Sequence, residues 1–421
     1  MFQKTTLKNG LRIITVPQEG TKAATVFVLV GTGSKYEKKE ISGASHFLEH
    51  LFFKGTKKRP SVFKIVEPLD KVGGIFNAFT GEEYTGYFVK VDSSHVNLAL
   101  DWVSDIYLNS LFPEKEVEKE RRVIIEEINM CLDAPMMYVG ELWKRVLYGD
   151  QPAGWDISGN KETISKISRS QIMDYMKSQY AASNTVVCVS GNISSVKTVE
   201  SVKKYFSKIR KTNSFLKEPV VEKQAWPKAL VLEKNTDQTH LALGVRAYNL
   251  FHPQKYALEV LGTILGGMMS SRIFLEIRDK RGLSYYTHTN VDANPDTGYL
   301  MTSAGVDNSR VEEAITGILK EYKKISEKKV SAQELKRAKD HIKGKTALQL
   351  ETSDAKASFY AGQELLEKKI LTPEQIFASI DKVTANDILE VAKDIFKPQK
   401  LNLALIGPFK NKNKFQRLLR L

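Results

Sequence analysis

The stretch HFLEH, residues 46–50, carries more information about the chain than any other segment. On a helix, positions i and i+4 share one face, so His46 and His50 can direct both imidazoles at one metal ion. Glu49 is close enough to act as a general base on a water molecule without binding the metal itself. The competing interpretation is a helix with two ordinary histidines on a partly buried face. The stretch therefore predicts a helix over residues 42–53 that carries a metal site.

A catalytic zinc ion usually has three protein ligands and one open position, so a third ligand is expected elsewhere in the chain. The helix predicted from residue 113 to residue 134 supplies Glu127, which shares the apolar side of that helix with Val123 and Ile124. Its neighbour Glu126 falls on the solvated side. A carboxylate buried without a partner is strongly unfavourable, so a buried Glu127 indicates a bound cation.

Two alternatives to Glu127 as a ligand stay open at this point. Glu127 could form a salt bridge with an arginine, or Cys131 could be the third ligand. Glu120 lies seven residues before Glu127 on the same helix face, and from there it could orient a ligand or the water molecule.

Around this stretch, strands and helices follow one another in an order that restarts after residue 228. Each half is therefore expected to be an α+β domain, a mostly antiparallel sheet with helices packed on one side. The predicted domains are residues 1–210, which carry the metal site, and residues 229–421, joined by a linker over residues 211–228. The second half has LEVLG at residues 258–262 where a repeat would place the histidine motif, so one metal ion per chain is expected. The predicted strands cover residues 11–16, 24–30, 83–91, 185–189, 229–233 and 239–245, and the other predicted helices cover residues 94–108 and 255–265.

Composition excludes several classes of protein. The chain has 421 residues, 42% of them hydrophobic, and no apolar run approaches the roughly 18 residues of a membrane span. The net charge of +14 comes from basic residues that are scattered among acidic ones, which argues against a nucleic-acid site. Two cysteines cannot form a disulfide framework, and the N-terminus has no apolar signal core. We therefore expect a cytoplasmic protein with no membrane span and no nucleic-acid partner.

The motifs together resemble a known family. HFLEH is followed 77 residues after His50 by Glu127 in VIIEEI, residues 123–128. This arrangement is similar to the inverted-motif zinc metallopeptidases, which include pitrilysin, insulysin and the β subunit of mitochondrial processing peptidase. The length resembles the half-size, two-domain subgroup. Further segments that look like family blocks are residues 33–37, 73–80, 267–272 and 278–285, together with Gly159 and its flanks.

The resemblance implies a zinc endopeptidase and assigns roles to individual residues. In the family an arginine and a tyrosine seven residues apart contact the substrate, and the matching pair here is Arg278 and Tyr285, with Tyr286 as the competing tyrosine. The implied zinc ligands are His46, His50 and Glu127, with Glu49 as general base and Glu120 as its support.

The segment Asn77, Ala78, Phe79 and Thr80 is similar to the family's edge strand, on which an extended peptide lies by backbone pairing. The alternative is an ordinary turn into a strand. If the resemblance holds, the partners of the protein are extended or unfolded peptides.

The resemblance also bears on assembly. In full-length relatives the matching arginine and tyrosine belong to the last of four domains and face a zinc site in the first. A two-domain chain then implies a homodimer in which Arg278 and Tyr285 of one chain complete the zinc site of the other. A heterodimer with a related subunit, and a site completed within one chain, are the alternatives. Another function carried by this family is that of a noncatalytic core or partner subunit of a processing-peptidase complex.

Overall fold

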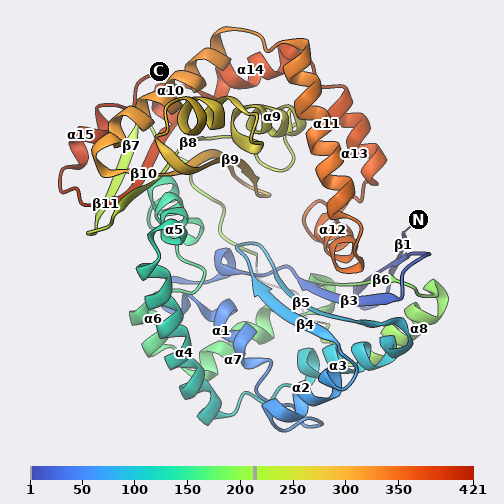
Figure 1. Ribbon diagram of the computed structural model, residues 1–421. Helices are drawn as coiled ribbons and strands as arrows, with labels where there is room; N and C mark the ends of the chain where they lie inside the picture. Colours follow the sequence, from blue (N-terminus) through green and yellow to red (C-terminus); the bar gives the residue numbers. More distant parts are fainter. Residues whose placement is uncertain (1, 212–215) are drawn as a thin grey trace. The chain divides into compact units, whose positions relative to one another are not determined.

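The computed structural model describes residues 2–211 and 216–421, and its contacts divide the chain into two compact units. The N-terminal unit comprises residues 1–129, 155–218 and 348–370, and the C-terminal unit comprises residues 130–154, 219–347 and 371–421. Both units combine a sheet with helices, so the expected two-domain α+β fold is confirmed (Figure 1). Of the predicted linker, residues 212–215 lie outside the described residues, and its last residue, Lys228, begins a strand.

The N-terminal unit is built on a six-stranded sheet of order β1-β2-β6-β3-β5-β4. Its central strands consist almost entirely of buried residues, so both faces of the sheet need a cover. The strands are β1 (Gln3–Thr6), β2 (Arg12–Pro17), β3 (Ala23–Val30), β4 (Ile75–Thr80), β5 (Thr85–Asp92) and β6 (Thr185–Gly191). The helices are α1 (Ala44–Leu51), α2 (Val62–Asp70), α3 (Val96–Asn109), α4 (Glu114–Asp133), which runs into the other unit, α6 (Lys161–Lys166), α7 (Arg169–Gln179), α8 (Ser195–Tyr205) and α12 (Ser353–Leu366).

The C-terminal unit has a five-stranded sheet of order β7-β11-β8-β10-β9. In each sheet one parallel pair, β2-β6 or β7-β11, is followed by antiparallel strands, so the two units share one topology. The strands are β7 (Lys228–Glu233), β8 (Gln238–Arg246), β9 (Ser284–Ala293), β10 (Gly298–Asp307) and β11 (Leu401–Gly407). The helices are α5 (Pro135–Tyr148), α9 (Lys255–Gly262), α10 (Val311–Glu327), α11 (Ala332–Gln349), α13 (Pro373–Asp381), α14 (Ala385–Ile395) and α15 (Lys412–Gln416), with π-helical turns η6 (Thr263–Gly267) and η7 (Phe274–Lys280).

One helix of each unit comes from the other half of the chain. The sequence instead predicts two continuous domains, each with helices on one side of its sheet. In the N-terminal unit α12 packs on β3 and β6, where Tyr360 and Leu365 meet Phe27 and Cys188 (Figure 1). In the C-terminal unit α5 packs on β11, where Trp143 lies in one cluster with Ile406 and Ala242. These helices bury the second, equally apolar face of each sheet.

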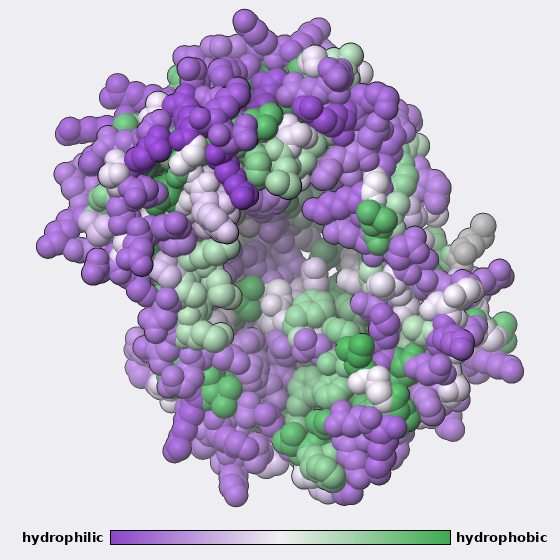
Figure 2. Space-filling view, viewed as in Figure 1, coloured by the Kyte–Doolittle hydropathy of each residue, from purple (hydrophilic) through white to green (hydrophobic). Residues whose placement is uncertain are grey.

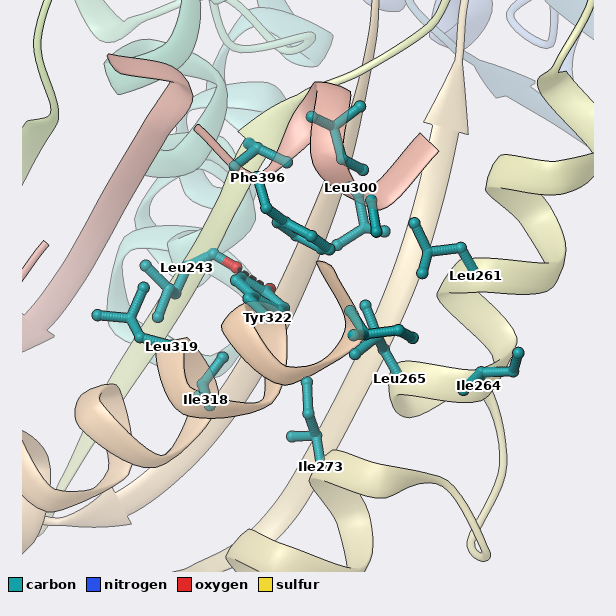
Figure 3. Close-up of a cluster of buried hydrophobic side chains, with 14 of the residues drawn as sticks. Leu243, Leu261, Ile264, Leu265, Ile273, Leu300, Ile318, Leu319, Tyr322 and Phe396 are labelled. Carbon is teal, nitrogen blue, oxygen red and sulfur yellow. Dashed lines mark hydrogen bonds between the residues drawn. The ribbon is translucent and has the colours of Figure 1, made fainter. Parts of the chain in front are cut away.

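The core of the C-terminal unit shows how its helices are fixed to the sheet. The hydroxyl group of Tyr322 donates to the carbonyl of Leu243 at 3.0 Å (Figure 3). It also lies 2.7 Å from Thr302 Oγ1, so these two contacts tie α10 to β8 and β10. Its ring stacks on that of Phe396, with 4.4 Å between the centroids. Leu258 and Leu261, from the segment where a repeat would place the histidine motif, are buried in this core.

The outside of the molecule is mostly hydrophilic on the face drawn in Figure 2. Within the described part of the chain, every helix is too short or too polar to cross a membrane.

Candidate metal site

Helix α1 presents the two histidines of HFLEH on one side. Phe47, Leu48 and Leu51 are fully buried and anchor the opposite side of this helix in the core. His46 and His50 are one turn apart, and their ring centroids lie 4.7 Å from each other. The hydrophobic packing of α1 thus turns both imidazoles away from the core.

Helix α4 brings Glu127 to the two histidines. Glu127 Oε2 lies 3.7 Å from Nε2 of His46 and 3.4 Å from Nε2 of His50. The three donor atoms lie within 4.8 Å of one another, and this is the only such group of metal-binding side chains in residues 2–211 and 216–421. Two imidazoles and one carboxylate are a donor set of catalytic zinc sites, so the residues present fit a zinc ion.

The second nitrogen of His50 is held by Glu120, which is only 3% exposed. His50 Nδ1 lies 3.1 Å from Glu120 Oε2, and Lys54 Nζ lies 2.7 Å from Glu120 Oε1. Burial acts to raise the pKa of Glu120, but the bonds from His50 and Lys54 hold it below its usual value. Glu120 therefore stays ionised and fixes the orientation of the His50 ring, as an outer partner of a metal ligand does.

The two histidines differ in their proton affinity. Burial, followed by the nearby charge of His50, lowers the pKa of His46 to about 4. Burial also acts to lower the pKa of His50, but the hydrogen bond with Glu120 and the charges of Glu127 and Glu49 together raise it. His46 is thus neutral, the form that binds a metal, over the whole physiological range.

Glu49 lies beside the metal-binding group without belonging to it. Its Oε2 accepts a hydrogen bond from Thr80 Oγ1 at 2.6 Å, which connects α1 to the end of β4. Burial raises the pKa of the Glu49 carboxyl, while the bond from Thr80 counters this rise. A carboxylate with raised proton affinity suits a general base.

Two details of the sequence interpretation need correction. The side chain of Glu127 is 37% exposed, whereas that of Glu120 is 3% exposed, so the buried acid on α4 is Glu120 and not Glu127. Val123 is 39% exposed and does not define the apolar side of the helix. The reason is that α4 is covered along the side of Ile124 and Ile128 but open where Glu127 faces the histidines.

The other candidate on α4 is Cys131, which is not in the metal-binding group. Glu126 is exposed, as expected from its place on the helix.

Strand β4 holds the predicted substrate-binding segment, residues 77–80, at an edge of its sheet, since its one neighbour in the strand order is β5. Gly81 N donates to Tyr84 O, so alternation along the antiparallel pair points the backbone groups of Ala78 and Thr80 away from β5. The N–H group of Ala78 donates to the Asn77 side chain at 2.9 Å, in keeping with an outward direction. An extended peptide could pair with these groups.

In the C-terminal unit Arg278 and Tyr285 lie together. The guanidinium of Arg278 lies 5.0 Å from the ring centroid of Phe274 and 5.7 Å from that of Tyr285. Arg278 belongs to η7, and Tyr285 is the extra residue of a β-bulge, since Gly305 pairs with Tyr286 and Val306 with Ser284. Such irregular elements are frequent where side chains are aimed at a ligand.

Tyr285 and Tyr286 differ in their surroundings. Tyr285 is 78% exposed, whereas the hydroxyl group of Tyr286 lies 2.9 Å from His240 Nδ1. Gly305 leaves the room for that ring, because a Cβ there would come within 2.5 Å of it. The accessible tyrosine of the two is therefore Tyr285.

Two contacts of the site were not found from the sequence. The sequence pattern places Thr80 on the substrate strand and does not indicate its bond to Glu49, nor does it indicate the ion pair of Lys54 with Glu120. Lys54 follows His50 by four residues, which is the one sequence signal that places it beside the same helix face.

Two α+β units of one topology, one of them with a His–His–Glu donor set, correspond to the class of two-domain metallopeptidases. Residues 12–160 match the family model described as insulinase (peptidase family M16), and residues 166–342 match the model described as peptidase M16 inactive domain. The chain belongs to peptidase family M16. The resemblance to pitrilysin-type zinc proteases is thereby confirmed.

Relatives and solved structures agree with this placement. The chain is 34% identical to a Bacillus subtilis (strain 168) protein named uncharacterized zinc protease YmxG, over 98% of this chain and 99% of that protein. It is 33% identical to uncharacterized zinc protease SCO5738 of Streptomyces coelicolor, over 97% of this chain and 90% of that protein. The crystal structure of a protease from Helicobacter pylori matches with a TM-score of 0.89 at 25% identity, over 97% of this chain and all of that one. A peptidase M16 inactive domain from Pseudomonas fluorescens has the same fold, with a TM-score of 0.89 at 16% identity, over 98% of this chain and 99% of that one.

Proposed function

We propose that the protein is a zinc-dependent endopeptidase that hydrolyses peptide bonds in extended or unfolded peptides. The observation that carries the proposal is that the donor atoms of His46, His50 and Glu127 lie within 4.8 Å of one another. Glu49 lies on α1, the helix that also carries the two histidines. Membership of a peptidase family, with relatives named zinc proteases, supports the zinc and the general activity.

In this mechanism His46, His50 and Glu127 would hold one zinc ion per chain. When bound, zinc supplies Lewis acidity, which polarises a carbonyl group and lowers the pKa of water. Thr80 occupies Oε2 of Glu49, so Oε1 is the oxygen that takes a proton from the attacking water and returns it to the leaving amine. Glu120 keeps His50 in the orientation that binding requires.

Substrate binding is assigned to two places. The outward backbone groups of β4 pair with an extended peptide. Thr80, the last residue of β4, is bonded to Glu49 on α1, so a peptide on this strand has its carbonyl groups near Glu49. Arg278 and Tyr285 contact the substrate and stabilise the oxyanion that develops during attack. We propose that they do so across a two-fold homodimer. A heterodimer with a related subunit is the alternative assembly, and the cytoplasmic location stays a prediction.

The alternative function is that of a noncatalytic partner subunit. A subunit without catalysis has no need of Glu49, which binds no metal in this arrangement, so its presence beside a complete donor set favours the enzyme.

The test is a peptidase assay on an unstructured peptide and on a compact folded protein, before and after removal of metal with a chelator. We expect cleavage of the peptide, little attack on the folded protein, loss of activity with the chelator and its return with zinc. Activity that survives complete removal of metal would contradict the proposal.

A further inference from the structure

Glu37 is a buried acid that lies at the start of the histidine helix. It is 4% exposed and follows the short helix η1 (Ser34–Tyr36). Its Oε2 accepts a hydrogen bond from the N–H group of Gly43 at 2.6 Å, and its Oε1 accepts one from the N–H group of Ser45 at 2.7 Å. One carboxylate thus binds two of the free N–H groups at the beginning of α1.

The helix needs this outside partner because its own N-cap residue is a glycine. Gly43 has a φ of +96°, and a Cβ there would come within 2.6 Å of Ile164 Cδ1 and 2.7 Å of Ser158 O. A capping serine or aspartate therefore does not fit at this position. Glu37 supplies from a distance the oxygen atoms that an N-cap side chain normally supplies.

A second contact fixes the same turn. The hydroxyl group of Ser45 lies 2.8 Å from that of Tyr175, which in turn lies 2.7 Å from Thr32 Oγ1 and donates to Gly33 O at 3.2 Å. Burial acts to raise the pKa of Glu37, while the bonds from the N–H groups of Ser45 and Gly43 act to lower it, since each oxygen of the ionised carboxylate accepts one of them. The first turn of α1 is thus held by a buried polar network.

The next residue along the helix is the metal ligand His46. His50 is oriented by Glu120, but His46 Nδ1 is buried and has no hydrogen-bond partner within residues 2–211 and 216–421. The position of the His46 ring therefore depends on the backbone of the first turn. Glu37 fixes that backbone at Ser45, one residue away.

We infer that Glu37 is a positioning residue of the metal site, which holds His46 in place through the first turn of α1. The inference rests on the proposed function, because it takes His46, His50 and Glu127 to be the metal ligands. Outer partners of metal ligands contribute about 10- to 100-fold to metal affinity or activity, and the same range is expected here.

The test compares Glu37→Gln with a control, Asp105→Asn. A glutamine keeps the size of the side chain but turns an NH₂ group toward one of the two N–H groups. Asp105 is also buried, and its hydrogen bonds with Thr56, Arg59 and Asn109 all go to residues outside α1. The measurements are the affinity for Zn²⁺, the absorption spectrum of the Co²⁺-substituted protein, kcat, KM and the melting temperature.

We expect Glu37→Gln to bind Zn²⁺ about 10- to 100-fold more weakly, with a changed Co²⁺ spectrum and a lower kcat at an unchanged KM. Asp105→Asn should lower the melting temperature but leave the affinity for Zn²⁺, the Co²⁺ spectrum and kcat unchanged. If Glu37→Gln behaves like Asp105→Asn, the positioning role is wrong while the proposed function stands. If the wild-type protein binds no metal, both are wrong.

A milder variant keeps the test decisive if Glu37→Gln does not fold. Glu37→Asp retains the charge but is one methylene shorter, so it can reach only one of the two N–H groups. Its affinity for Zn²⁺ should lie between the affinities of the wild type and Glu37→Gln. If the glutamine variant does not fold, the affinity of Glu37→Asp should still be lower than that of the wild type. An unchanged affinity in Glu37→Asp would overturn the inference.

Discussion

Glu49 and its two flanking histidines share a helix but have different partners. The histidines meet Glu127, whereas Glu49 is bound by Thr80 on another element. This separation of ligands from base leads to opposite expectations for their variants.

For Glu49→Gln we expect zinc content to stay at the wild-type level while kcat falls by about 10²- to 10⁴-fold, because a glutamine cannot accept the proton of water. Zinc analysis and a peptide assay on the same sample measure this. Glu126→Gln, an exposed neighbour on α4, is the control and should change neither quantity. Near-normal turnover in Glu49→Gln would rule out the role assigned to it.

The unequal histidines predict how zinc affinity depends on pH. In the metal-free protein the pKa of His46 is about 4, and that of His50 lies above its usual value. Zinc binds neutral imidazole, so between about pH 5 and pH 6.5 only His50 must lose a proton, and affinity should fall about tenfold for each unit by which the pH falls. Competition with a chromophoric chelator measures this slope. A fall of about a hundredfold per unit over that range would show that both histidines release protons.

At the residue scale, the sequence predicted which side chains come together better than it predicted their surroundings. Helical spacing placed both histidines on one face and distinguished Glu127 from Glu126. It did not reveal that Thr80 reaches Glu49 or that Glu37 caps α1, because these contacts depend on where the chain returns in space and not on local periodicity.

At the scale of elements, β4 has backbone groups on its outer side that a substrate can use. The N–H group of Ala78 points outward, whereas that of Asn77 belongs to the ladder with β5. A proline is tolerated on an edge strand when its missing N–H group faces out.

Ala78→Pro should therefore lower kcat/KM by about 2- to 10-fold, the effect of one lost hydrogen bond to substrate, with little change in melting temperature. Asn77→Pro is the matched control, since it removes a ladder bond and should lower the melting temperature. Steady-state kinetics and thermal unfolding of both variants decide this. An unchanged kcat/KM in Ala78→Pro would argue against pairing of the substrate on β4.

The regular elements that the sequence predicted lie close to elements of the structure, whereas its irregular elements were not predicted. The strands that include residues 24–30 and 185–189 and the helix from residue 113 are close to β3, β6 and α4, because apolar pattern and proline position define them. The π-helical turns η6 and η7 and the bulge at Tyr285 have no periodicity of their own, so the sequence pattern could not indicate them.

At the scale of the whole molecule, the repeat inferred from the order of strands corresponds to two sheets of one topology. The placement of α5 and α12 was not predicted, since each packs on strands that are distant in the sequence. An amphipathic pattern shows that a helix has an apolar face, but it does not show which sheet that face covers.

The two-fold dimer predicts complementation between inactive variants. Mixed dimers of Glu49→Gln with the double variant Arg278→Ala, Tyr285→Phe should carry one site with both defects and one with neither. Activity should therefore return to at most about half of the wild-type level per mixed dimer. Subunit exchange and peptidase activity are measured on the same mixture of the two variants. No recovery despite confirmed exchange, or an active monomer, would contradict a site shared between chains.

The central claim is that His46, His50 and Glu127 hold the zinc ion on which activity depends. Elemental analysis of wild type and Glu127→Gln, purified without chelators, tests it most directly. The account predicts about one zinc ion per wild-type chain and little zinc in Glu127→Gln, because a neutral amide is a poor zinc ligand. A wild-type chain without zinc, or an undiminished zinc content in Glu127→Gln, would contradict it.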